Sequence, residues 1–131
     1  MATNGTIRYS MNVSLSNGSL ADSYNTSGLT ATQVTGSIVR NVQTLQVASV
    51  QGDLLDFGGV AIAPASPGLA AFSNLDALNY VEIGIRVSQV FYPFMKLLAG
   101  QQAGPLFLGA SVIYARDNTA NVQLFYLAYS I

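Results

Sequence analysis

The chain has no cysteine, no histidine and no tryptophan, and it has few charged residues. The lack of cysteine excludes disulfides, thiolate metal sites and a thiol nucleophile. The lack of histidine removes the commonest general base. Only 8% of the 131 residues are charged, whereas an ordinary soluble domain has about 25%. Because charge keeps proteins apart in solution, we expect neighbouring subunits to cover much of the surface, the alternative being a small stable domain coated with Ser, Asn and Gln.

The positive charges are too dispersed to follow a phosphate backbone. The basic residues occur singly, as Arg8, Arg40, Arg86, Lys96 and Arg116. We therefore expect no nucleic-acid binding. The N-terminus has no apolar core behind a basic start, so we expect no signal peptide. The weakly polar stretch 58–72 is too short to span a bilayer and contains Pro64 and Pro67, so we expect no membrane span.

The N-terminal region is polar and rich in turn-forming residues. Residues 6–15 alternate between apolar and polar side chains, which predicts a half-buried strand. Residues 16–28 are rich in Asn, Ser and Gly and are predicted to form a turn followed by a polar loop. We expect residues 1–30 to form a flexible extended arm or loop.

The rest of the chain has the pattern of short strands separated by turns. Apolar, β-branched runs occur in 34–50, 52–59, 69–75, 80–87, 89–98, 105–115 and 122–131. Helical periodicity is poor, and Pro93 indicates an edge strand or a bulge. The chain is therefore predicted to be all-β: one domain, 1–131, folded as a β-sandwich or jelly roll of about eight short antiparallel strands.

A turn precedes the most regular of these strands. Asn74, Asp76 and Asn79 have side chains that can bond to nearby backbone N–H groups, which predicts a structural turn. The strand that follows alternates between two faces. Val81, Ile83, Ile85 and Val87 share one face, and Tyr80, Glu82, Gly84 and Arg86 share the other. The turn is expected to set the register of this core strand.

The last predicted strand is apolar on both faces. Val122, Leu124, Tyr126 and Ala128 lie on one face. Phe125, Leu127, Tyr129 and Ile131 lie on the other. Such a strand is either central in a sandwich or covered by a partner. We predict that the second set contacts another protein.

No residue pattern predicts catalysis or a bound cofactor. Asp76 and Glu82 are the best candidate carboxylate pair, but a turn Asp beside a solvent-facing Glu is the more ordinary interpretation. Lys96 lies in no motif of a Ser–Lys enzyme. Asp53 and Asp56 lack the spacing of a calcium loop. We therefore expect no enzyme activity, no cofactor and no metal.

The second half of the chain resembles small structural proteins of tailed-bacteriophage particles. The residues with this pattern are "NLDALNYVEIGI" (74–85), "FYPFMKLLAGQQAGPLFL" (91–108) and "IYARDNTANVQLFYLAYSI" (113–131). The resemblance implies a β-sandwich subunit made in the host cytoplasm and located on the phage particle. Its expected partner is the major capsid protein or another virion protein, and a homo-oligomer such as a trimer is expected.

Several functions stay open at this point. The first is a capsid decoration or cement protein that bridges capsomers. A tail, neck or fibre-attachment component is the rival location. A lectin-like carbohydrate-binding module, with Tyr80, Asn79 and Asp76 at its site, is the alternative of another class.

Overall fold

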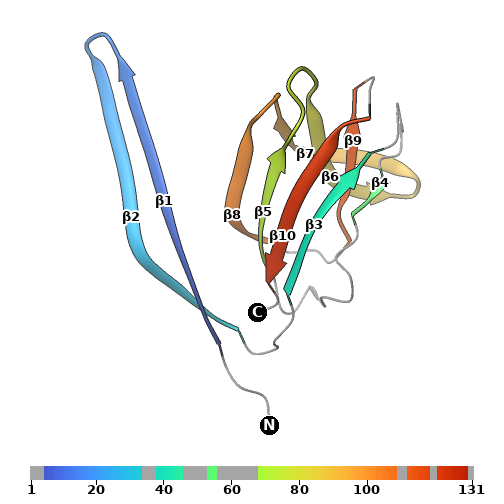
Figure 1. Ribbon diagram of the computed structural model, residues 1–131, viewed down its shortest axis with the longest axis horizontal. Coiled ribbons are helices and arrows are strands. Elements are labelled where there is room, and N and C mark those ends of the chain that lie inside the picture. Colours follow the sequence, from blue (N-terminus) through green and yellow to red (C-terminus); the bar gives the residue numbers. More distant parts are fainter. Residues whose placement is uncertain are drawn as a thin grey trace.

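The protein is built from antiparallel strands. A computed structural model describes residues 5–33, 38–45, 53–55, 68–108, 112–118 and 121–129. Within these ranges it has ten strands and no helix (Figure 1). The strands are β1 (Gly5–Asn17), β2 (Leu20–Gln33), β3 (Ile38–Thr44), β4 (Asp53–Leu54), β5 (Gly68–Asn74), β6 (Val81–Val87), β7 (Val90–Leu97), β8 (Gln102–Leu108), β9 (Tyr114–Asp117) and β10 (Gln123–Tyr129). The predicted all-β class is confirmed.

Eight of the strands form two four-stranded sheets. One sheet has the order β3-β10-β5-β8, and the other has the order β4-β9-β6-β7. The pairs are antiparallel, and Figure 1 shows the sheets one behind the other. The pairing is nested, because β3 pairs with β10, β4 with β9, β5 with β8 and β6 with β7. Strands that are distant in the sequence are thus direct neighbours in each sheet.

The hydrophobic core lies between these two sheets. Both sheets contribute buried residues to it: Leu45, Leu55, Ala70, Phe72, Val81, Ile83, Leu97, Leu108, Ile113, Ala115, Val122, Leu124, Tyr126 and Ala128. Burial of apolar side chains from two facing sheets is the arrangement of a β-sandwich.

The hydroxyl of Tyr126 enters this core and is satisfied there. Tyr126 is fully buried. Its hydroxyl accepts a hydrogen bond from Asn41 Nδ2 (3.0 Å) and donates one to Gln43 Oε1 (2.8 Å). A buried tyrosine hydroxyl needs such partners, because an unpaired one loses its hydration without compensation. Strand β3 therefore turns polar side chains inward.

The N-terminal region differs from the prediction. β1 and β2 have 13 and 14 residues and pair with each other as a separate two-stranded sheet, so the predicted polar loop at 16–28 is wrong. The two-residue turn at Gly18 and Ser19 has a positive φ (58°) at Gly18, which glycine adopts without strain. Such turns join antiparallel strands tightly, so the polar residues after it pair as a strand.

The strand after the Asn74 turn also departs in part from its prediction. Val81 and Ile83 are buried as expected, but Ile85 and Val87 are 37% and 53% exposed. The pairing of β6 with the edge strand β7 shifts between Ile83 and Gly84, where Pro93 stands opposite Gly84. The sequence predicted that Pro93 lies either in an edge strand or at a bulge. The structure places it at a bulge of an edge strand. Only the first half of β6 belongs to the core.

Candidate functional site: the outer face of the β3-β10-β5-β8 sheet

Strand β10 separates its two sets of apolar side chains between the core and the outside. Leu124, Tyr126 and Ala128 are fully buried. Phe125, Leu127 and Tyr129 point to the opposite side of the sheet and are half-buried. Ile131, the fourth predicted contact residue, lies outside the described residues. The structure therefore gathers three of the four predicted contact residues on the outer face of a central strand.

The neighbouring strands extend this outer face with further apolar residues. On β3, Ile38 lies beside Tyr129 and Val42 beside Phe125, and they are 66% and 50% exposed. On the other side, Phe107 of β8 is 50% exposed. We call this surface the apolar face. Its larger part consists of Ile38, Arg40, Val42, Ala71, Ser73, Phe107, Phe125, Leu127 and Tyr129, and its polar end consists of Thr44, Gln102 and Gln123. Leu69 lies on the same side of the sheet but is buried.

A single charge lies on the apolar face, among the residues that the structure describes. It is that of Arg40, which stands opposite Leu127 and is exposed. A solvated sheet face normally has many polar and charged side chains. An apolar sheet face with one charge is instead typical of a surface that another protein covers.

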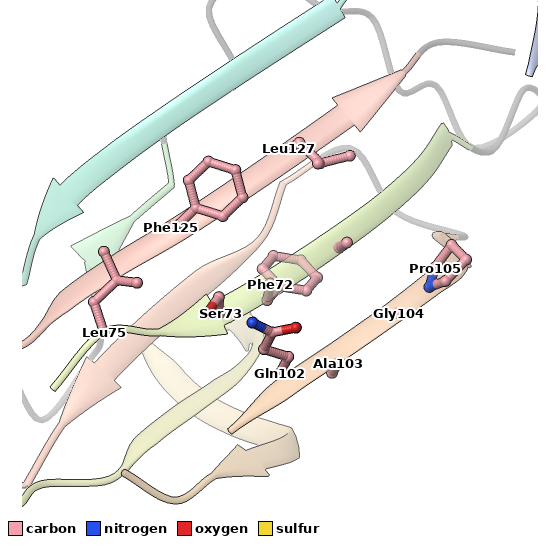
Figure 2. Close-up of a pocket in the computed structure, with 10 residues that line it drawn as sticks. Phe72, Ser73, Leu75, Gln102, Ala103, Gly104, Pro105, Phe125 and Leu127 are labelled. Carbon is pink, nitrogen blue, oxygen red and sulfur yellow. The ribbon is translucent and has the colours of Figure 1, made fainter. Parts of the chain in front are cut away.

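A shallow depression of about 380 Å³ lies in this face. Figure 2 shows it between β10, with Phe125 and Leu127, and the segment Gln102–Pro105 of β8. It lies where the pairing of β5 with β8 shifts register. Its lining is mainly apolar, without a charged side chain. The depression is therefore suited to an apolar side chain of a partner rather than to a polar substrate.

The outer face of the other sheet is different in kind. Arg116 Nε donates to Glu82 Oε1 (3.0 Å), and the two residues stand opposite each other on β9 and β6. Arg86 lies over the ring of Tyr114 (4.1 Å) and donates to its hydroxyl (3.0 Å). Such partly exposed pairs are compatible with water on that face. The β6–β7 hairpin of that sheet also exposes Ile85, Val87, Val90, Tyr92 and Phe94. The apolar face therefore differs from the other outer face in its low charge, not in exposed apolar side chains alone.

No known protein family, curated protein or solved structure matches this chain. The surfaces of the protein are therefore the basis on which a function is proposed below.

The predicted turn at residues 74–79 is held by the side chains of Asn74 and Asp76. Asn74 Oδ1 accepts from the Asp76 N–H (2.9 Å). Asp76 Oδ1 accepts from the N–H groups of Leu78 (2.7 Å) and Asn79 (2.6 Å) and from Asn79 Nδ2 (3.1 Å). The backbone N–H of Leu78, followed by that of Asn79, lowers the pKa of Asp76 below its ordinary value. The Asn79 side chain bonds the carboxylate, not a backbone N–H as expected.

Asn74 has a second role that the sequence did not indicate. Its Nδ2 donates to the carbonyl of Asn79 (2.8 Å) and to the carbonyls of Leu97 and Leu98 (both 3.1 Å). Asn74 ends β5 in one sheet, whereas Leu97 ends β7 in the other. The buried amide therefore ties the two sheets together at one end of the sandwich. Nothing in the local spacing predicts a contact across 23 residues.

The charged residues Lys96 and Glu82, considered for catalysis, contact other side chains of the protein. Lys96 Nζ lies 4.0 Å above the ring centre of Tyr80, and Glu82 pairs with Arg116 as described. In the part of the chain described, no three Asp or Glu residues gather as metal ligands. The side chains of Asp53 and Asp56 lie outside that part. Among described residues, no helix is long and apolar enough to cross a membrane.

Proposed function

We propose that the protein is a non-enzymatic structural subunit of a bacteriophage particle, most simply a decoration or cement protein of the capsid. The observation that supports this most directly is the apolar face. It has Arg40 as its one described charge, while the opposite face of the sandwich has several ion–aromatic and ion pairs. A subunit that neighbouring subunits, including other copies of itself, cover on one side and water covers on the other needs this division.

The strand order adds support for this class of protein. The eight strands from β3 through β10 pair in a nested order. This order is expected of a jelly roll, in which eight strands form two facing sheets. Viral capsid domains and lectins both use this architecture. The strand order is therefore compatible with a capsid role and does not by itself distinguish it from sugar binding.

The proposed mechanism is adhesion. A standard protein interface buries about 800 Å² on each partner. Contacts of this kind, repeated over a lattice, hold neighbouring subunits together through multivalency even where each contact is weak. Such bridges would resist the outward pressure of packaged DNA. A tail or neck subunit would use the same adhesive chemistry, so it remains the rival location.

The sugar-binding alternative receives less support from the geometry at its candidate site. A lectin usually presents an open aromatic ring beside free polar acceptors. Here the Tyr80 ring has Lys96 above it. Asp76 Oδ1 already accepts three hydrogen bonds within its own turn. One of those bonds comes from the side chain of Asn79, so all three candidate sugar contacts are engaged by the protein itself.

The test is made on particles of the phage that encodes this chain. Purified virions are analysed by quantitative mass spectrometry, and copies of the chain are counted relative to the major capsid protein. We expect a stoichiometric component of full heads. Absence of the chain from purified virions would overturn the proposal. Presence only in separated tails would move the subunit to the rival location.

A further inference from the structure

The β1–β2 hairpin, called the arm here (Gly5–Gln33), has two chemically different faces. One face is polar, with pairs such as Asn12 with Asn25 and Ser14 with Ser23. The other is apolar, as the pairing of Val13 with Tyr24 illustrates. The large side chains of the apolar face beyond the base of the arm are Met11, Val13, Leu15, Leu20 and Tyr24, which are 41–62% exposed. The apolar face of the arm is therefore open to solvent.

Among the described residues, the sandwich of the same copy contacts the arm at its base. The rings of Tyr9 and Phe107 meet edge to face with centroids 5.9 Å apart, so the arm starts at the β8 edge of the apolar face. From there Figure 1 shows the arm standing apart from the sandwich. A hairpin of two strands is marginally stable in water unless something covers one face. A partner that covers the arm is therefore needed.

The apolar face of the sandwich is complementary to the arm in charge as well as in polarity. The arm's apolar face includes one acidic residue, Asp22, which stands opposite Leu15. The sandwich's apolar face includes one basic residue, Arg40, which stands opposite Leu127. Both charged residues are exposed. The apolar face of the arm and the apolar face of the sandwich therefore each have one charged residue, and the two charges have opposite signs.

We propose that the arm packs on the apolar face of a second copy of this chain, with Asp22 paired to Arg40 of that copy. The arm then forms a third layer over the β3-β10-β5-β8 sheet, at the roughly 10 Å spacing of packed sheets. Its apolar side chains meet Phe125 and Leu127. The proposal names the occupant of the apolar face, and it holds for the free protein whether or not that protein belongs to a particle.

The area that each copy can bury favours a closed assembly. The exposed apolar side chains of one arm offer on the order of 400 Å². This is about half of the roughly 800 Å² that a stable interface buries on each partner. When every copy gives one arm and receives one, the area buried on each copy doubles and reaches that standard. A two-fold dimer or a closed ring satisfies this condition.

The test is the molar mass of the full chain in solution, measured by light scattering after size exclusion over a concentration series. The wild type is expected to form a discrete oligomer. Asp22→Arg or Arg40→Asp alone places like charges together and should raise the dissociation constant about tenfold or more. The double variant restores opposite charges and should recover most of the affinity. Arg8→Asp, on the polar face of the arm, is the matched control and should leave the oligomer intact.

A cross-linking measurement does not depend on the charge variants. Because the chain has no cysteine, Asp22→Cys protein can be mixed with Arg40→Cys protein and treated with a short bifunctional thiol reagent. A cross-linked heterodimer is expected, and the mixture of Arg8→Cys with Arg40→Cys should give none. A wild type that is monomeric at every concentration would overturn the proposal. So would charge effects that simply add in the double variant, or equal cross-linking in the control mixture.

Discussion

Replacing Asn74 with alanine should separate one end of the two sheets. The side chain is 1% exposed and donates to three carbonyls, while its oxygen accepts from the Asp76 N–H. Alanine leaves these groups without partners, and the carbonyl of Leu97 is in a buried bond. The full penalty of roughly 1–3 kcal/mol applies to that buried carbonyl, and the part-buried groups, which water can reach, add less. We therefore expect a loss of about 3 kcal/mol in the free energy of unfolding.

The assay is urea denaturation at one fixed protein concentration, supported by thermal melting. For a chain of this size the loss corresponds to a melting temperature lower by about 10 °C. Asn12→Ala, at an exposed position of β1, is the control and should cost less than about 0.5 kcal/mol. Asn74→Asp keeps the acceptor but removes the donor and buries a charge, so it should cost more than alanine at neutral pH. If Asn74→Ala and Asn12→Ala have equal effects, the amide does not tie the sheets and the reasoning is refuted.

Three further outcomes can be checked on the same protein. The β6–β7 turn holds Ser88 and Gln89 at φ values of 50° and 69°, so Ser88→Asn with Gln89→Gly should raise the free energy of unfolding by about 1–2 kcal/mol in denaturation. The pKa of Asp76 is lowered in the folded state. Its contribution is therefore present above the unfolded value of about 4 and is lost as pH falls through the lower folded pKa, and acid titrations of stability should show a shallower decline for Asp76→Asn. Phe125→Ser and Tyr129→Ser should weaken oligomerisation, measured by light scattering, and leave the circular dichroism spectrum of the subunit unchanged. Unfolding of those subunits without any effect on assembly would mean that the two side chains stabilise the sandwich itself.

The sequence predicted the structure well where the alternation of side chains along a strand matches its two faces. On β10 the alternation separated Leu124 and Tyr126 of the core from Phe125 and Leu127 of the outer face, because a strand central in a sandwich shows both sets in its pattern. The side chains of the Asn74 turn were also recognisable, since their bonds are local.

Prediction failed where distant residues decide the environment. On β3, Asn41 and Gln43 face inward because the Tyr126 hydroxyl, more than eighty residues away, needs them. The exposed Ile38 and Val42 therefore look like core residues in the sequence, and the part of β3 in the apolar face was missed. The polar segment after Gly18 pairs as β2 because its partner β1 precedes it, although Ser and Asn alone favour loops.

The nested order of the strands has a consequence for how the chain acquires its structure during synthesis. β10 is hydrogen-bonded on both sides, to β3 and to β5, so the sheet that contains the apolar face lacks its central member until β10 has left the ribosome. Pairing β3 with β10 closes a loop of some eighty residues, and such non-local closure slows folding to about milliseconds to seconds. The arm pairs only with adjacent sequence and can form within about microseconds of its emergence. Each nascent chain would therefore present its arm before it has a completed sheet on which another copy's arm could bind.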